Sequence, residues 1–239
     1  MKLPRMYTEF ACWWPLISPP QDYADESHFY REKLVSACKI QPSTMLELGC
    51  GGGNNASHLK EFFDMTLVDL SPDMLAVSQE LNPECEHLLG DMRSLRLRRT
   101  FDTVFIHDAV VYMTSEHDLA MAIETAYLHC NTAGAALFAP DDVSETFKAS
   151  TSHGGGDDGA RSVRYLEWVH PLSNGDNRYR VDYAYLLQEG NNPLRVESDH
   201  HVCGLFSCQT WLRLLRQAGF ETEQHTDIHG CKVFIGKKG

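Results

Sequence analysis

The chain has 239 residues, 43% of them hydrophobic, which is enough for a packed core in one large domain or a domain with an insertion. Its 33 acidic and 21 basic side chains give a net charge of −12, which repels phosphate backbones and excludes a large nucleic-acid footprint. No apolar run approaches the roughly 20 residues that span a bilayer, and no apolar stretch of a secretory signal follows the first residues. The eight cysteines are scattered without a Cys-x-x-Cys pair, which is typical of reduced thiols. We therefore expect a cytoplasmic protein with no DNA or membrane partner.

Residues 1–25 are rich in aromatic side chains and prolines, and the prolines exclude a long helix. Two interpretations remain open for this segment. It either packs across one end of the core, or it forms a lid whose rings, including Tyr7 and Trp14, line a ligand site. Apolar side chains at helical spacing then predict a helix over residues 25–40.

The central stretch is a short apolar run, residues 45–48, that leads into four glycines within residues 49–53. A buried strand followed by a glycine-rich turn and a helix is how open α/β sheets form a nucleotide-sized crevice. A dinucleotide fingerprint fails because its last glycine would fall at Asn54, and a phosphate-binding loop fails because no Gly-Lys-Ser/Thr ending is present. The pattern that remains is Glu-x-Gly-x-Gly-x-Gly, beginning at Glu47.

Further elements follow in alternation. Apolar runs predict strands over residues 65–69, 86–89, 101–107 and 135–139, with helices over residues 56–63, from residue 71 onward and over residues 115–128. Such an order indicates a mostly parallel sheet with both faces covered. Residues 153–159, rich in glycine, are expected to form a flexible loop. Alternating patterns then predict antiparallel strands over residues 163–170, 179–188 and 194–201, with turns at residues 174–176 and 189–192. A helix over residues 207–217 and a hairpin from residues 221–228 and 232–237 complete the chain.

Acidic residues stand at three neighbouring strand ends of this sheet. Glu47 precedes the glycine loop, where a carboxylate is unfavourable for a pyrophosphate but favourable for an ammonium or sulfonium. Asp69 ends the second strand, where it can accept hydrogen bonds from a ribose diol. Asp91 follows the third strand and can accept from an adenine amino group, with Met92 beside the ring. Three such acids suit a cationic adenosine compound.

At these residues the sequence resembles the class I S-adenosylmethionine-dependent methyltransferases. The matching segments are residues 46–53, 67–75, 90–95 and 101–106, and the likeness covers roughly residues 30–140 and the closing helix and hairpin. It implies that S-adenosylmethionine is the cofactor, with its methionine end at Glu47 and the glycine loop, its ribose at Asp69 and its adenine at Asp91 and Met92. The His107 backbone would meet the cofactor ammonium. The full set implied to bind the cofactor is Glu47, Gly49, Cys50, Gly51, Gly53, Asp69, Leu70, Asp91, Met92 and His107.

The resemblance also implies the fold class: a Rossmann-like α/β domain over residues 1–239, its mostly parallel sheet ending in a C-terminal antiparallel hairpin. Residues 1–25 are expected to form an N-terminal lid segment, and residues 145–205 are expected to form an inserted antiparallel β layer. In small-molecule N-methyltransferases of the family such a layer covers the acceptor pocket and offers a surface for a homodimer. We expect methyl transfer to a nitrogen or oxygen of a small soluble molecule. Methylation of a protein or RNA, or cofactor binding without turnover, are the alternatives.

The methyl acceptor is less clearly indicated. The end of the fourth strand projects into the crevice, so His107 and Tyr112 are candidates for catalysis. The sequence is equally compatible with His107 as a core residue whose ring nitrogens are hydrogen-bonded. The full set of candidate substrate contacts is Tyr7, Trp14, Asp108, Tyr112, Trp168 and His201. Of Tyr165 and Trp168, at most one can line the pocket, because they would face opposite sides of a strand. His200 and His201 would likewise point apart, so we expect no metal site.

Overall fold

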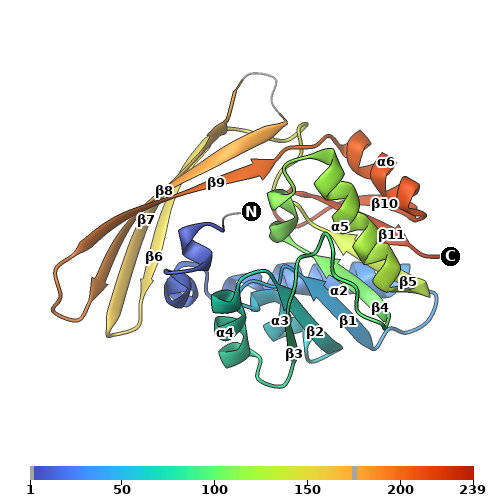
Figure 1. Ribbon diagram of the computed structural model, residues 1–239, viewed down its shortest axis with the longest axis horizontal. Coiled ribbons are helices and arrows are strands. Elements are labelled where there is room, and N and C mark those ends of the chain that lie inside the picture. The colour runs from blue at the N-terminus through green and yellow to red at the C-terminus, as the bar shows by residue number, and fades with distance from the viewer. Residues whose placement is uncertain (1–2, 174–176) are drawn as a thin grey trace.

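The computed structural model describes residues 3–173 and 177–239 and contains two sheets (Figure 1). Seven strands form the main sheet in the order β10-β11-β5-β4-β1-β2-β3, and four form a second sheet in the order β6-β7-β8-β9. The predicted turn at residues 174–176 lies outside the described residues. Within those residues, no helix is long and apolar enough to cross a membrane.

The main sheet confirms the predicted fold class. Its central strands are parallel, whereas β11 pairs antiparallel with β5 and with β10. In chain order its strands are β1 (Thr44–Leu48), β2 (Asp64–Asp69), β3 (Glu86–Leu89), β4 (Phe101–Ile106), β5 (Cys130–Phe138), β10 (Glu221–Thr226) and β11 (Lys232–Lys237). The helices associated with it are α2 (Ala24–Ala37), α3 (Asn54–Leu59), α4 (Pro72–Leu81), α5 (Glu116–His129) and α6 (Cys208–Ala218).

Helices cover both faces of this sheet, as its continuous apolar strands require. One core unites β-strand side chains with α5 and α6, and within it Trp211 stacks on Phe234 with ring centroids 5.1 Å apart. The other core places α2 and α3 on the opposite face, where Tyr30 and Leu34 are almost fully buried. The carboxyl ends of the parallel strands therefore stay open at one edge, where a ligand can bind.

The second sheet projects from the main body (Figure 1) and has one strand more than the sequence predicted. Its strands are β6 (Ser150–Asp157), β7 (Arg161–Pro171), β8 (Arg178–Glu189) and β9 (Arg195–Gly204). The flexible loop predicted for residues 153–159 is wrong over most of its length, because β6 pairs with β7 along its whole length. Its glycines allow close approach: a Cβ added at Gly154 would lie 2.6 Å from the Tyr165 hydroxyl, and one at Gly156 2.6 Å from the Leu16 carbonyl.

The N-terminal segment lies between the two sheets and is bonded to both. It consists of the short helices η1 (Arg5–Tyr7), η2 (Ala11–Trp13), α1 (Trp14–Ile17) and η3 (Pro20–Tyr23). On one side the Tyr7 carbonyl accepts a hydrogen bond from the Ser71 hydroxyl at the start of α4. On the other side the Met6 amide donates to the Asp199 carboxylate of β9, at 2.8 Å. Phe10 is fully buried against Tyr185 of the second sheet, so the segment joins the two layers.

The bounds of several elements differ from the predicted ranges, most of all those of α3 and β5. The helix α3 begins at Asn54, two residues earlier than predicted, and ends at Leu59. The strand β5 begins at Cys130 rather than residue 135, and within it Ala133 has φ +70°. Gly134 lies so close to the Asp102 carbonyl that an added Cβ would be 2.3 Å away. Glycine at position 134 therefore allows a close backbone contact inside the strand.

Candidate active site

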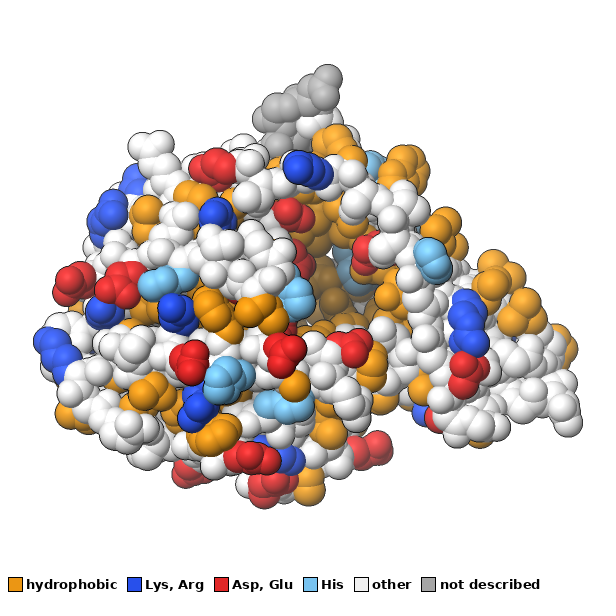
Figure 2. Space-filling view, turned by 180° about the vertical axis from the view of Figure 1, so that it is seen from behind, with side chains coloured by type: hydrophobic (Ala, Val, Ile, Leu, Met, Phe, Trp, Pro, Cys, Tyr) orange, Lys and Arg blue, Asp and Glu red, His pale blue; other side chains and the backbone are white. Residues whose placement is uncertain are grey.

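A cavity of about 540 Å³ opens between the carboxyl ends of the parallel strands, the N-terminal segment and the inner face of the second sheet. Figure 2 shows the molecule hollowed between its main body and the projecting sheet, with acidic side chains gathered around the hollow. Most of the predicted site residues line this cavity: Tyr7, Trp14, Glu47, Gly49, Cys50, Gly51, Asp69, Leu70, Asp91, Met92, His107, Asp108, Tyr112 and His201. Gly53 and Trp168 do not.

The glycine loop is held against the second strand of the sheet. The amides of Gly49 and Cys50 both donate to the Val68 carbonyl, at 2.7 and 3.0 Å. Gly49 has φ +76°, and an added Cβ would lie 2.3 Å from the Cβ of Ala109. Only glycine combines this backbone conformation with so close a contact. The loop therefore lies flat across the strand ends and exposes its backbone to the cavity.

Gly53 is not among the residues that line the cavity, and its contact with the cofactor stays a prediction. Gly53 precedes α3 with φ +78°, and a Cβ there would lie 2.3 Å from both Ser78 Oγ and Asn82 Nδ2 of α4. The Asn82 amide in turn donates to the Gly53 carbonyl at 2.9 Å. Gly53 thus allows α3 and α4 to pack closely behind the loop.

Replacing Gly53 with alanine is expected to lower the free energy of unfolding by about 2 kcal/mol or more. A left-handed residue with a Cβ costs roughly 1–2 kcal/mol, and the contact with α4 adds strain. Gly190→Ala is the matched control, because Gly190 has φ +53° but nothing within 4 Å of an added Cβ. Urea unfolding should show the larger loss at Gly53. Equal losses at both positions would mean that the contact with Ser78 and Asn82 contributes nothing.

The three acids at the strand ends differ in their surroundings. Glu47 is buried, its Oε2 finds no hydrogen-bond donor among the described residues, and burial together with the charge of Asp69 raises its pKa to about 8. Asp69 accepts from the amides of Gly51 and Ser71, both at 2.8 Å, while burial raises its pKa. Asp91 is held by Arg93, whose hydrogen bonds lower the pKa of that carboxyl. A carboxylate has about four acceptor positions, so Asp69, which accepts from two amides, can still accept from a ligand. The backbone and guanidinium of Arg93 already contact both oxygens of Asp91.

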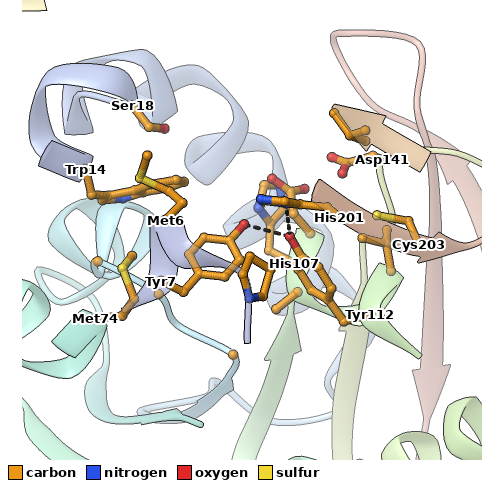
Figure 3. Close-up of a pocket in the computed structure, with 18 of the residues that line it drawn as sticks. Met6, Tyr7, Trp14, Ser18, Met74, His107, Tyr112, Asp141, His201 and Cys203 are labelled. Carbon is orange, nitrogen blue, oxygen red and sulfur yellow. Dashed lines mark hydrogen bonds and ion pairs between the residues drawn. The ribbon is translucent and has the colours of Figure 1, made fainter. Parts of the chain in front are cut away.

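A hydrogen-bonded chain of rings closes the other half of the cavity (Figure 3). The Tyr7 and Tyr112 hydroxyls are 2.8 Å apart, and Tyr112 Oη lies 2.7 Å from His201 Nδ1. His201 Nε2 lies 3.3 Å from Asp199. Although burial opposes it, hydrogen bonds from His201 and the Met6 amide lower the pKa of Asp199 to about 2. Burial raises the pKa of Tyr112 far above its usual value, so its phenol stays protonated.

His107 lies where the parallel strands end. Its Nδ1 is 3.1 Å from Asp108, and its Nε2 is 3.3 Å from Glu26 and 3.2 Å from the Tyr30 hydroxyl. Burial lowers the pKa of His107 in spite of these acids, which keeps the ring neutral. The prediction left open whether this histidine is a core residue or a base. The His107 side chain is mostly buried, as expected of a core residue, but it also contacts Asp108 on the cavity wall, as expected of a residue that takes part in proton transfer.

The sequence reasoning missed several residues that line the cavity. Asp141 and Asp142 were missed, whereas their neighbour Asp108 was predicted. Desolvation beside the cavity wall raises the pKa of Asp108 to about 7, that of its hydrogen-bond partner Asp141 well above the usual range and that of Asp142 to about 6, although Asp141 and much of the Asp108 side chain remain exposed to the open cavity. Asp141 and Asp142 follow the fifth strand, so the rule that acids at strand ends converge could have found them. Of the pair Tyr165 and Trp168, only Tyr165 lines the cavity, and the second sheet adds four side chains that no sequence signal identified, namely Glu167, Tyr179, Tyr183 and Cys203.

Trp168 is a wrong prediction. It lies on the outer face of β7, 53% exposed, where its ring packs on His170. Alternation along the strand places Tyr165 and Glu167 on the cavity side instead. His200 and His201 also point apart, since His201 is buried and His200 is exposed. Over residues 3–173 and 177–239, no group of three or more histidine, cysteine, aspartate or glutamate residues is arranged to hold a metal ion.

Known proteins with a similar sequence indicate which kind of enzyme has this site. Residues 45–134 match the model of a methyltransferase domain family. The chain is 27% identical over 219 residues to dTDP-3-amino-3,4,6-trideoxy-alpha-D-glucopyranose N,N-dimethyltransferase of Streptomyces venezuelae, covering 90% of this chain and 91% of that one. The chain therefore contains a methyltransferase domain, in line with its resemblance to the class I S-adenosylmethionine-dependent methyltransferases. Its methyl donor is S-adenosylmethionine.

Two further proteins are similar to this methyltransferase. A Streptomyces fradiae enzyme named dTDP-3-amino-3,6-dideoxy-alpha-D-glucopyranose N,N-dimethyltransferase is 26% identical over 197 residues, which cover 80% of this chain and 74% of that one. The sugar N-methyltransferase KedS8 from Streptoalloteichus sp. ATCC 53650 superposes with a TM-score of 0.85 at 24% identity, covering 100% of this chain and 94% of that one. This second likeness shows the shared fold, including the second sheet.

The residues of the crevice suit the cofactor. S-adenosylmethionine carries a positive sulfonium and an amino acid group. The positive charges favour carboxylates nearby, the ammonium needs hydrogen-bond acceptors, and the cofactor carboxylate needs hydrogen-bond donors. Among the described residues, Glu47 Oε2 is a buried acceptor without a donor and Trp14 Nε1 is a buried donor without an acceptor, and both residues line the cavity. We propose that Glu47 and Trp14 hold the methionine end, that Asp69 holds the ribose, and that Asp91 and Met92 contact the adenine. The bound cofactor supplies an electrophilic methyl group.

Cofactor affinity should depend on pH through Glu47. In the free protein its pKa of about 8 leaves it protonated at neutral pH, whereas a cation beside it favours the ionised form. Binding therefore releases a proton, and affinity should rise by up to tenfold per pH unit between about pH 6 and pH 7.5. Calorimetric titration in buffers of different ionisation enthalpy measures both effects. Glu47→Gln should abolish the proton release; a pH dependence that survives this change would exclude Glu47 as its source.

Proposed function

We propose that this methyltransferase transfers methyl groups to the amino group of a small amino sugar. The observation that carries the proposal is the acidic, aromatic-lined cavity beside the cofactor crevice. Carboxylates of Asp108, Asp141, Asp142 and Glu167 line it, and no lysine or arginine is found among its described lining residues. Such a wall favours a cationic amine over a neutral hydroxyl, since opposite charges attract strongly in a partly enclosed site.

The raised pKa values support an amine in particular. Like charges crowd Asp108, Asp141 and Asp142, and a bound ammonium would relieve that repulsion. An ammonium must lose a proton before its lone pair can attack a methyl group. Asp108, with a pKa of about 7, is suited to accept that proton near neutral pH. His107 contacts Asp108 at 3.1 Å and can pass the proton onward.

The rings of the second sheet supply the rest of the acceptor site. Tyr112, fixed by Tyr7 and His201, presents a neutral phenol that can hydrogen-bond a sugar hydroxyl. Tyr165, Tyr179 and Tyr183 offer aromatic faces, which attract cations and pack on sugar rings. In this proposal Tyr112 holds and orients the acceptor, while the in-line displacement depends mainly on alignment and exclusion of water. The walled, acidic cavity disfavours a protein or RNA acceptor, which needs an open groove.

The amino sugar is suggested by the two Streptomyces relatives, whose names specify dTDP-linked 3-amino sugars. The described lining residues of this chain provide no lysine or arginine for a diphosphate. The test therefore compares free amino sugars with dTDP-linked ones, and with matched sugars that carry a hydroxyl in place of the amine. We expect S-adenosylhomocysteine release and a mass gain of one or two methyl groups with amines only. Turnover of the hydroxyl analogues alone would overturn the proposal.

A further inference from the structure

A second cavity of about 390 Å³ adjoins the first beside His107. It is enclosed by α2, the short helix η3, the ends of β4 and β5, and the loop between β10 and β11. The two cavities share the residues Ile17, Ser18, Tyr23, His107, Asp108, Asp141 and Tyr165. The space proposed for the acceptor therefore has two branches, one under the second sheet and one toward the C-terminal hairpin.

Carboxylates dominate the second branch. It is lined by Asp22, Glu26, Asp108, Asp141 and Asp227, and its described lining residues include no lysine or arginine. The two histidines that line it are His107 and His229. Burial keeps His107 neutral, and His229 lies at the exposed rim. An anion such as a diphosphate would meet uncompensated negative charge here, whereas a cation would meet several partners.

Glu26 gives this branch an unsatisfied binding group. Its side chain is only 10% exposed, and its Oε1 is buried without a hydrogen-bond donor among the described residues. His107 Nε2 lies 3.3 Å from Oε1 and His229 Nε2 lies 3.9 Å from Oε2, and the Asn55 side chain is a further hydrogen-bonding neighbour of the carboxyl group. A buried carboxylate oxygen without a donor is unfavourable unless a ligand supplies one. An ammonium placed in the cavity would do so.

We propose that the second branch binds a second ammonium group of the acceptor, so that the natural acceptor is a small amino sugar with at least two amino groups. This inference rests on the proposed amine methylation, in which Asp108 and Asp141 receive the nitrogen that is methylated. Glu26, Asp22 and Asp227 then hold the other nitrogen. The second charge selects the acceptor and fixes its orientation.

The test uses pairs of amino sugars in which one member has a second amine and the other a hydroxyl at the same carbon. Release of S-adenosylhomocysteine is measured for each pair. The diamino member is expected to have a kcat/KM at least 30-fold higher, and Glu26→Gln should reduce that ratio to below threefold. Asp25→Asn, an exposed acid on the same helix that does not line the branch, should leave the ratio unchanged.

Each contrary outcome has a distinct meaning. Equal rates for both members of every pair would overturn the second site and leave amine methylation standing. No turnover of any amine by a protein that still binds S-adenosylmethionine would overturn the proposed function and this inference with it. If Glu26→Gln weakens the binding of S-adenosylhomocysteine more than twofold, Glu26 serves the cofactor instead. Asp22→Asn, at the rim, should lower the ratio by a smaller factor.

Discussion

Replacing Asp69 with alanine is expected to weaken S-adenosylmethionine binding by 100-fold or more. The Asp69 carboxylate accepts hydrogen bonds from the Gly51 and Ser71 amides and thereby shapes the glycine loop. In the proposed complex it also accepts from the ribose. Hydrogen bonds to a charged group each contribute about 1.5–3 kcal/mol, so the loss of two accounts for an effect of this size. Calorimetric titration measures it directly.

Asp73→Ala is the control for this experiment. Asp73 is an exposed acid in the first turn of α4, four residues away, and removing it changes the net charge by the same amount. The affinity of the Asp73→Ala protein for the cofactor should stay within about threefold of that of the unsubstituted protein, because an exposed charge is screened by solvent. Undiminished binding by Asp69→Ala would contradict the proposed cofactor site.

Replacing Asp141 with asparagine is expected to lower kcat/KM for an amine acceptor by at least about 100-fold while leaving cofactor affinity unchanged. Asparagine keeps the shape of the side chain but removes the charge that would hold the ammonium. Two charges about 4 Å apart attract by roughly 4 kcal/mol at an effective dielectric constant of 20, more than the ~2.7 kcal/mol that the loss requires. The expected loss of activity therefore needs only part of the available attraction.

The same substitution should not destabilise the fold. Desolvation beside the cavity wall and the neighbouring Asp108 raise the pKa of Asp141 above its value in the unfolded chain, although Asp141 remains exposed to the open cavity. A raised acid pKa in the folded state means that stability falls as pH rises above the unfolded pKa. Because Asp141 is exposed, solvent screens this penalty, so the free energy of unfolding of Asp141→Asn at pH 8 should stay within about 0.5 kcal/mol of that of the unsubstituted protein. A large loss of stability would mean that Asp141 supports the fold and not the acceptor.

Local signals in the sequence predicted the cofactor half of the molecule well. The apolar runs, the serine at the start of the helix predicted from residue 71 and the glycines of the loop are signals that depend on only a few neighbouring residues. The side chain of Ser71 does accept from the Met74 amide at the start of α4, and β3 has the predicted bounds. The acids Glu47, Asp69 and Asp91 were found because parallel strands bring their carboxyl ends to one edge.

The acceptor half was harder to predict because long-range contacts decide it. The glycines of β6 resemble a loop locally, and they form a strand because β7 and the backbone of Leu16 approach them closely. Glu167 and Tyr183 enter the cavity only through the orientation of the second sheet, which no local pattern encodes. Trp168 was misplaced for the same reason, since alternation tells which residues share a face but not which face lies inward.

The most direct test of the account is the fate of a labelled methyl group. The protein is incubated with S-adenosylmethionine carrying a ¹³C-methyl group and with amino sugars, and the product is examined by NMR. The account predicts that the labelled carbon is bonded to the amine nitrogen and that Asp141→Asn removes this signal. Label found on oxygen, or no transfer to any amine by a protein that binds the cofactor, would contradict it.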